Sequence, residues 1–459
     1  MERFLLVVAN REQFPEPAFP LGALYVAGAV EAAGGWARVF DAGLYRRPLA
    51  ALRAELADFR PGVVGLSLRN ADNAAYPCTR TYADWYARVA AALRAAAPRA
   101  RLVAGGPAFS IFPRELRRAL LLADGVVGDG ETGAALLAAG RLPAGLAEEP
   151  LGDLGTVGLP RELATVFPGA QRYRTVGVQT ARGCPHGCIY CTYPRLEGAL
   201  LRRRPPEAVV DELERLCRDL GTADAFIVDS SFNADERHLV AVCEEVCRRR
   251  SRPGSTLAGL SFSCYLQPRV SDPGVFALLA AAGCTSVDFG ADSAAEALLA
   301  RLGKSFTISD LRAATAAAKG AGLDVCLSLL FGGPGETPAT VAETVRVTDE
   351  LAPTAVVAMA GLRIYPGTAL AALAGEAGLI GEREPLLTPR FYAAGMLAGD
   401  PRAAWLFGAV RAVAASRRSW FLPGARDWSA AWGPRLLRRL GKPGPLWRNF
   451  PRPRWYRYV

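Results

Sequence analysis

The stretch ARGCPHGCIYCTYP, residues 181–194, decides the fold of this chain, because it places three cysteines on one short loop. The cysteines are Cys184, Cys188 and Cys191, and they follow VGVQT, residues 176–180, which has the pattern of a buried strand. Three thiolates on a tight loop at the end of a strand can hold three irons of a [4Fe–4S] cluster. No fourth cysteine follows at a matching spacing, so one iron would stay open to an outside ligand.

Two other interpretations of the three cysteines stay open. They could be structural cysteines that happen to cluster, although Gly183, Pro185 and Gly187 indicate a loop with a defined shape. They could also bind zinc, but a zinc ribbon needs a second pair of ligands, and no C-x-x-C recurs downstream. The chain has only two histidines, which excludes a three-histidine metal site and disfavours a Ser-His-Asp triad. The iron–sulfur interpretation is therefore favoured.

From this loop onward, strand and helix patterns alternate to about residue 378. Between the strands, apolar residues recur at helical spacing, as in residues 207–220. Six β/α units predict a partial (β/α)6 barrel of the TIM type over residues 171–384. The six predicted strands read VGVQTA, AFIVDS, LSFSCY, SVDFGA, VCLSLLF and VVAMAGLRIY.

Residues 1–142 show a second, earlier alternation of short strands and helices. This pattern predicts a doubly wound, Rossmann-like α/β sheet, in which ligands bind at the carboxyl ends of the strands. Residues 143–170 read as a linker between the two α/β domains. The candidate ligand-binding residues at the predicted strand ends are Asn10, Asp41, Arg69, Asn70, Gly105, Gly106, Gly130 and Glu131.

The last segment, residues 385–459, is predicted to be a small, mostly α-helical region with a basic, Trp- and Arg-rich composition. Residues 401–459 hold 13 Lys and Arg residues, a single acidic residue, Asp427, and six of the eight tryptophans. Such a mixture could bind nucleic acid, but no RNA-binding module is recognisable. We favour a cover over the open side of the barrel; docking of an acidic electron donor such as flavodoxin or ferredoxin is a third possibility.

The composition of the chain restricts the class of protein to which it can belong. Of 459 residues, 51% are hydrophobic and 21% charged, which is typical of folded domains with real cores. No run of about 18 uncharged apolar residues occurs, so no membrane span is expected. The N-terminus has the pattern of a first buried strand and not of a signal peptide. We therefore expect a cytoplasmic protein, in which cysteines stay reduced.

The cysteine loop, with Tyr190 before its last cysteine, resembles the signature of the radical S-adenosylmethionine (SAM) superfamily. The resemblance implies a [4Fe–4S] cluster whose open iron binds SAM, with Tyr190 near the adenine. VDFGADS, residues 287–293, is similar to the segment that helps to hold SAM, which implies Asp292 and Ser293 as contacts. LLFGGPGET, residues 329–337, resembles the glycine-rich turn after the fifth strand, which implies Gly332 and Gly333. Thr337 and Pro338 predict the start of the next helix.

Two residues outside these motifs are candidates for catalytic contact with substrate. Asp229 ends the second predicted barrel strand, in VDSSFN. Tyr365 ends the last one, in LRIYPGT, which is similar to the last strand of the radical SAM family. Both side chains are expected to point toward the interior of the barrel.

The N-terminal domain resembles the cobalamin-binding domain that is fused to one large branch of this superfamily. The resemblance lies in PLGALYVAGAVEAAG, SLRNADN, AGGPAFSIFP and GDGE. Free-standing cobalamin domains carry D-x-H-x-x-G, whose histidine binds cobalt, whereas here Asp41 is followed by Ala42, Gly43 and Leu44. The resemblance therefore implies a cobalt without an imidazole ligand from this domain. Arg69 is the candidate for the group facing cobalt; alternatively it pairs with Asp72.

By resemblance, the expected activity is methylation of a small molecule with SAM and methylcobalamin as methyl donors, in an enzyme that also carries the [4Fe–4S] cluster. Three alternatives stay open. One is polar methyl transfer without an adenosyl radical, and another is cyclisation or rearrangement, in which SAM itself can be the substrate. The third is modification of tRNA or a peptide. A non-catalytic sensor is a further possibility, which loss of SAM cleavage would not impair.

Overall fold

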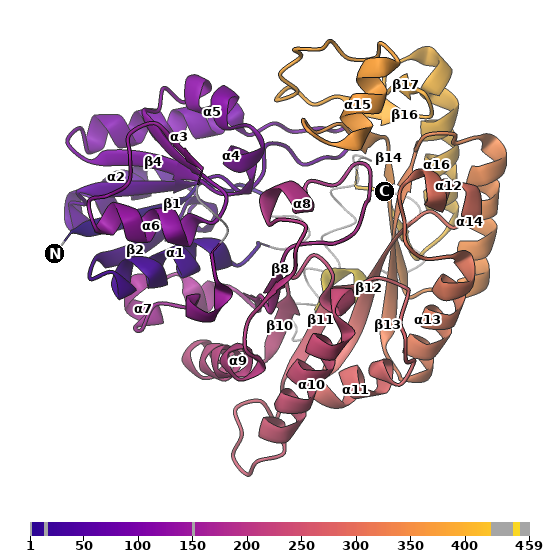
Figure 1. The fold of residues 1–459 in the computed structure, drawn as a ribbon, viewed down its shortest axis with the longest axis horizontal. Helices are drawn as coiled ribbons and strands as arrows, with labels where there is room; N and C mark the ends of the chain where they lie inside the picture. Colours follow the sequence, from indigo (N-terminus) through magenta and orange to yellow (C-terminus); the bar gives the residue numbers. More distant parts are fainter. Residues whose placement is uncertain (1, 13–16, 149–151, 424–443, 450–459) are drawn as a thin grey trace.

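The computed structural model describes residues 2–12, 17–148, 152–423 and 444–449. Within them, two parallel sheets lie on opposite sides of the molecule, each flanked by helices (Figure 1). The first sheet comes from the N-terminal third of the chain, and the second from residues 175–421. The short helix α8, Tyr193–Leu196, lies between the two halves in Figure 1 and contacts α4, Pro107–Ile111, of the first half.

The first sheet has six parallel strands in the order β2-β1-β3-β4-β5-β6. The order reverses direction between β1 and β3, and such a switch point is where doubly wound sheets bind ligands. This confirms the predicted Rossmann-like fold. The strands are β1 Arg3–Val8, β2 Trp36–Asp41, β3 Val63–Ser67, β4 Arg101–Gly105, β5 Asp124–Val127 and β6 Leu146–Glu148. The helices are α1 Leu21–Ala32, α2 Pro48–Phe59, α3 Ala83–Ala96, α4, α5 Pro113–Ala119 and α6 Gly130–Ala138.

The second sheet has seven parallel strands in the order β18-β14-β13-β12-β11-β10-β7, and it forms the predicted partial barrel. Its strands are β7 Thr175–Val178, β10 Asp224–Ile227, β11 Ser261–Leu266, β12 Cys284–Asp292, β13 Asp324–Phe331, β14 Ala355–Ala360 and β18 Trp420–Phe421. Its covering helices are α9 Pro206–Leu220, α10 Glu236–Arg250, α11 Val275–Ala282, α12 Glu296–Arg301, α13 Ile308–Gly320 and α14 Pro338–Leu351.

Local sequence explains where several helices begin and end. Helix α9 has proline at its first position and is capped after Leu220 by Gly221, whose φ of 62° suits glycine. Helix α14 begins as predicted, with Pro338 in its first turn and the Thr337 hydroxyl accepting a hydrogen bond from the backbone N–H of Thr340. These signals explain why helix boundaries in the barrel follow the sequence closely.

The connecting and C-terminal segments are more structured than a linker and a helical cap. Residues 146–148, within the predicted linker, extend the first sheet as β6. Residues 385–423 form the strands β16 Phe391–Ala393 and β17 Met396–Leu397, the helix α16 Ala404–Ser416, and β18, which pairs with β14 at the open edge of the barrel. Strand β15, Leu362–Arg363, pairs with β16. Much of the basic tail, at residues 424–443 and 450–459, lies outside the described residues.

Residues 444–449, the last segment that the structure describes, pack against the amino-terminal ends of two barrel strands. Trp447 is buried against Cys326 and Ala355, which lie at the amino-terminal ends of β13 and β14. The guanidinium of Arg448 pairs with the carboxylate of Asp324 at 2.6 Å, at the start of β13. Residues 444–449 therefore cover the end of the barrel opposite the cysteine loop. None of the helices in the described part of the chain has the length and apolarity needed to cross a membrane.

Candidate functional site

The cysteine loop is held in place by backbone contacts on both sides. The loop is flanked by a short antiparallel pair: β8, Ala181–Arg182, precedes the loop and pairs with β9, Arg202–Arg203, which follows it. The Cys184 N–H donates to the carbonyl of Gly198 at 3.0 Å, and the Ile189 N–H donates to the carbonyl of Leu302 at 3.1 Å. The loop shape thus depends on the turn after α12 as well as on its own glycines.

Gly303, in that turn, has φ +73°, and a Cβ there would lie 2.3 Å from the carbonyl oxygen of Gly187. We expect Gly303→Ala to push the cysteine loop outward and to lower the iron content after anaerobic reconstitution. Gly322→Ala is the matched control, because Gly322 has φ +78° and open space around it. Both variants carry the left-handed backbone cost of about 1–2 kcal/mol, so equal iron contents would contradict the prediction.

The three thiols suit an iron–sulfur cluster better than a single ion. Burial raises the pKa of Cys188, and it raises that of Cys191 to about 11; neighbouring thiols add to both shifts. Thiols whose pKa values are raised in this way, as those of Cys188 and Cys191 are, ionise together only around a cationic centre. Among the described residues, no group of three or more His, Cys, Asp or Glu side chains is placed to share one metal ion. The thiolates of a [4Fe–4S] cluster each bind a separate iron, so they need not converge on one point.

Beside the loop, Tyr190, Asp292 and Lys304 form a buried polar group. The hydroxyl of Tyr190 and the ammonium of Lys304 both contact the carboxylate of Asp292, and Lys304 also donates to the carbonyl of Gly290 at 3.0 Å. Asp292 has φ +60°, a conformation that costs energy for a residue other than glycine and is typical of functional sites. Two predicted SAM contacts are thus brought together, with Lys304 as a partner that the sequence analysis missed.

The other predicted SAM contacts have partners of their own. The Ser293 hydroxyl lies 3.0 Å from the Thr344 hydroxyl and accepts from the Ala295 N–H at 3.1 Å. Gly332 has φ +102°, and a Cβ on Gly333 would lie 3.0 Å from the Leu302 side chain. The glycine-rich turn therefore packs beside the turn that supports the cysteine loop. Ser293, Gly332 and Gly333 as direct SAM contacts stay predictions.

Asp229 holds the strand end that carries the cysteine loop. Its carboxylate accepts hydrogen bonds from the Thr180 N–H at 2.7 Å and from the Thr180 hydroxyl at 2.5 Å. Burial raises the pKa of Asp229 to about 7, against an ordinary value of 3.8, although the hydrogen bonds from Thr180 lower it. The geometry gives Asp229 a positioning role, whereas its predicted catalytic contact with substrate stays a prediction.

The raised pKa of Asp229 predicts a pH-dependent stability. Between about pH 4 and pH 7 the folded protein holds a proton on Asp229 and the unfolded chain does not, so stability falls as pH rises. The difference between the two pKa values corresponds to about 4 kcal/mol. We expect Asp229→Asn to flatten the change in melting temperature between pH 5 and pH 8.

Asp235→Asn is the control for this prediction. Hydrogen bonds from backbone N–H groups and Arg203 outweigh burial and lower the pKa of Asp235, so its stabilising effect is lost only as pH falls below its ordinary range. An unchanged pH slope in Asp229→Asn, or an equal flattening in Asp235→Asn, would contradict the assignment.

The strand ends of the first sheet face the barrel across the predicted cofactor site. Gly106 has φ +94°, and a Cβ there would lie 2.9 Å from the carbonyl oxygen of Leu68. The carbonyl of Asn70 accepts from the Tyr86 hydroxyl at 2.6 Å. Arg69 is exposed, and its charge acts on the hydroxyls of Tyr193 and Tyr265 on the barrel side. Arg69, Asn70, Gly105 and Gly106 as cobalamin contacts stay predictions.

The alternative that Arg69 pairs with Asp72 is wrong. Asp72 instead forms a buried ion pair with Arg363 of β15, with Nε and Oδ2 2.9 Å apart and both side chains at most 3% exposed. The Arg363 guanidinium also lies over the ring of Tyr365, 4.7 Å from its centroid. Tyr365 contacts Phe112 of the first domain as well, so it lies at the junction of the two domains. Its predicted catalytic role stays a prediction.

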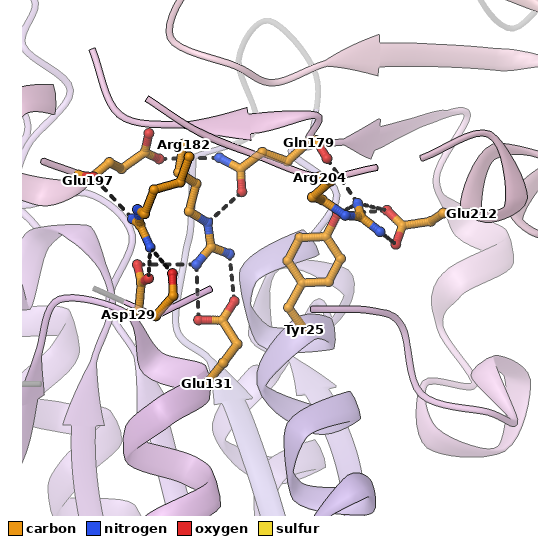
Figure 2. Close-up of polar contacts among 10 residues, drawn as sticks. Tyr25, Asp129, Glu131, Gln179, Arg182, Glu197, Arg204 and Glu212 are labelled. Carbon is orange, nitrogen blue, oxygen red and sulfur yellow. Dashed lines mark hydrogen bonds and ion pairs between the residues drawn. The ribbon is translucent and has the colours of Figure 1, made fainter. Parts of the chain in front are cut away.

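A second junction joins the domains next to the cysteine loop (Figure 2). Arg182, two residues before Cys184, forms ion pairs with Glu131 at 2.6 Å and with Asp129 at 3.2 Å, both from the start of α6. Arg202 of the neighbouring strand also pairs with Asp129, at 2.6 Å. The carboxylate of Glu131 is therefore engaged by Arg182, and its predicted contact with cobalamin stays a prediction.

Figure 2 also shows a third contact at this junction. The Arg204 guanidinium pairs with Glu212 of α9 at 2.9 Å, and both side chains are at most 5% exposed. The hydroxyl of Tyr25, from α1 of the first domain, donates to Glu212 at 2.6 Å and accepts from Arg204 at 2.9 Å. The first sheet and the cysteine loop are thus joined through buried charges whose pairing the sequence alone could not show.

Comparison with known proteins agrees with this two-domain architecture. The family model of the radical SAM superfamily matches residues 178–348, and the B12 binding domain matches residues 7–138. The chain is 28% identical over 447 residues to tryptophan 2-C-methyltransferase of Streptomyces laurentii, covering 80% of this chain and 74% of that protein.

Solved structures resemble the whole chain. The radical SAM methyltransferase TsrM from Kitasatospora setae, with cobalamin and a [4Fe–4S] cluster bound, superposes with a TM-score of 0.84 at 25% identity, covering 98% of this chain and 97% of that one. The cobalamin-dependent SAM radical enzyme OxsB shares the fold, with a TM-score of 0.69 at 15% identity, over 86% of this chain and 64% of that one.

The fold and the cysteine loop define a radical SAM enzyme. The B12-binding domain in front of the barrel places the chain in the branch of that superfamily with an N-terminal cobalamin-binding domain.

Proposed function

We propose that the protein is a cobalamin-dependent radical SAM methyltransferase that methylates a carbon atom of a small molecule. The observation that carries the proposal is the junction at Arg182: the residue two positions before Cys184 is paired with the start of α6, at the ligand-binding edge of the B12-binding domain. This fixes the cysteine loop next to the strand ends expected to bind cobalamin. The similarity to TsrM over 98% of this chain supports the same arrangement.

The residues present fit the three cofactors. Cys184, Cys188 and Cys191 would hold the [4Fe–4S] cluster, Tyr190 and Asp292 would contact SAM, and the strand ends of the first sheet would hold cobalamin. When bound, these groups supply a carrier for the methyl group of SAM and an electron-transfer centre. The chain itself orients the reactants and excludes water from between its two domains.

The substrate is proposed to be a small molecule, since TsrM has been solved with tryptophan as substrate and a SAM analogue bound. L-Tryptophan is therefore the first compound to test. An acidic electron donor of the flavodoxin or ferredoxin type is proposed as partner, because the 13 Lys and Arg residues of residues 401–459 would steer it. A cytoplasmic location is also proposed, because none of the ten cysteines is in a disulfide and three of them are the proposed cluster ligands.

The test is anaerobic reconstitution with iron, sulfide and cobalamin, followed by incubation with methyl-labelled SAM, a reductant and L-tryptophan or a panel of aromatic compounds. S-Adenosylhomocysteine together with 5′-deoxyadenosine would indicate radical methylation. S-Adenosylhomocysteine alone would indicate polar methyl transfer. 5′-Deoxyadenosine without transfer of the label would contradict the proposal and favour cyclisation or rearrangement.

A further inference from the structure

Asp288 is a buried carboxylate of the barrel wall that neither the cysteine loop nor the proposed SAM contacts use. Asp288 lies in the middle of β12, and its neighbours in register are Tyr265 on β11 and Cys326 on β13. In a parallel barrel, residues in register on adjacent strands point to the same side, so these side chains form one layer. Val287 and Phe289, on either side of Asp288, are fully buried and belong to the apolar core.

Asp288 has neutral partners in place of a counter-charge. The Ser328 hydroxyl donates to its Oδ1 at 2.9 Å, and the Cys326 thiol is a second donor. No Lys or Arg pairs with Asp288 within the part of the chain that the structure describes. A buried carboxylate without a cation destabilises a fold, so its presence in the barrel wall calls for a functional explanation.

Aromatic side chains surround the approach to this carboxylate. Tyr265 packs edge-on against Phe226 of β10, with ring centroids 5.0 Å apart. Tyr265 and Tyr193 are 42% and 38% exposed to solvent. Arg69 of the B12-binding domain acts on both hydroxyls from the opposite side. These rings therefore lie between Asp288 and the proposed cobalamin site, where a small molecule can reach them.

We propose that Asp288 binds a nitrogen-bound proton of the substrate, either the N–H of an aromatic heterocycle or an ammonium group. The proposal rests on the proposed function, since it assumes that the substrate enters between the two domains. An ammonium group would supply the positive charge that Asp288 lacks. A heterocyclic N–H would donate a further hydrogen bond to the carboxylate. The faces of Tyr193, Tyr265 and Phe226 attract cations, which favours an ammonium over a hydroxyl group, and they can stack on the planar ring of an aromatic heterocycle.

Burial raises the pKa of Asp288 to about 6, and the nearby carboxylate of Asp292 adds to this effect, whereas the hydrogen bonds from Ser328 and Cys326 lower it. The titratable groups that face Asp288 are Tyr265 from β11, Cys326 from β13 and Asp292 from its own strand. Near neutral pH the carboxylate is thus largely ionised, as binding of a nitrogen-bound proton requires.

Binding of paired probes to the reconstituted holoenzyme tests the proposal without turnover. The pairs are indole with benzofuran, which replaces the N–H by oxygen, and tryptamine with indole-3-ethanol, which replaces the ammonium by a hydroxyl. Affinities are measured by thermal shift and calorimetry. We expect at least one nitrogen compound to bind about tenfold more tightly than its partner, the effect of roughly one charge-assisted hydrogen bond.

Three variants separate the possibilities. Asp288→Leu removes the acceptor and should abolish the preference within each pair. Asp288→Asn keeps an acceptor but no charge, so it should lose the ammonium preference and keep part of the indole preference. Ser328→Ala removes a hydrogen bond that orients the Asp288 carboxylate, so it should partly reduce the preference for the nitrogen compounds. Because each preference is a ratio within one protein, an altered stability of a variant does not change it.

The proposal is overturned if the wild-type protein shows no preference within either pair, if none of the four probes binds, or if Asp288→Leu keeps the wild-type ratio. Failure of the proposed function is seen separately, as absence of S-adenosylhomocysteine formation in the turnover assay. A protein that forms S-adenosylhomocysteine but shows no nitrogen preference would retain the methyltransferase assignment and lose the role of Asp288.

Discussion

Cys188→Ala is expected to yield a folded protein that contains almost no iron after anaerobic reconstitution, where the wild-type chain holds about four irons. Cys188 and its two partner thiols lie on one loop, and two thiolates leave two irons of a cube unprotected. Iron and sulfide analysis, with the absorbance near 400 nm, measures the loss. All SAM-dependent turnover should disappear with the cluster.

Cys247→Ala is the control for this experiment. Cys247 lies near the end of α10, is partly buried like Cys188, and lies apart from the cysteine loop in sequence and in the fold. It should keep the wild-type iron content and turnover. Full iron content in Cys188→Ala, or equal losses in the two variants, would show that the loop does not bind a cluster.

Arg204→Met is expected to lower the free energy of unfolding by about 3–5 kcal/mol, because it leaves the buried carboxylate of Glu212 without its cation. The loss should be visible in urea or thermal unfolding. The double variant Arg204→Met, Glu212→Leu should regain most of the stability, since replacing both members of a buried pair by apolar residues is often tolerated.

Arg203→Met provides a matched control from the neighbouring residue. Its partner is Asp235, and the Arg203 side chain is 52% exposed, so the pair should contribute at most about 1 kcal/mol. Similar losses in Arg203→Met and Arg204→Met would mean that burial of the Arg204 pair is not what stabilises the domain junction. Tyr25→Phe, which removes one hydrogen bond to Glu212, should cost about 1–2 kcal/mol.

The sequence predicted those features that local pattern controls. Apart from β6, β8 and β9, which were not predicted, the strands from β1 to β14 lie where runs of apolar residues end in glycine or polar residues, and the cap at Thr337 follows from side-chain chemistry alone. The cysteine loop was recognisable because its ligands lie within eight residues of one another. Such signals depend on neighbours in sequence and need no knowledge of the tertiary fold.

Contacts between residues that are far apart in sequence could not be predicted. Asp72 and Arg363 are 291 residues apart, and nothing in either neighbourhood indicates that they pair. The contacts of Lys304 with Asp292 and of Arg182 with Glu131 arise in the same way, from the packing of separate elements. Asp288 resembled any polar residue within a strand until its layer in the barrel was known. The sequence signal that could have suggested Lys304 was a lysine twelve residues after Asp292, in the same β/α unit.

The ion pairs around Arg182 limit how this protein can be divided or recombined. A barrel expressed without the N-terminal domain would expose Arg182 and Arg202 without their acids, and an isolated N-terminal domain would expose Asp129 and Glu131 without their bases. Chimeras with related enzymes should therefore exchange both sides of this junction together. Shuffling at the boundary between the domains would otherwise produce chains whose halves fold but do not dock.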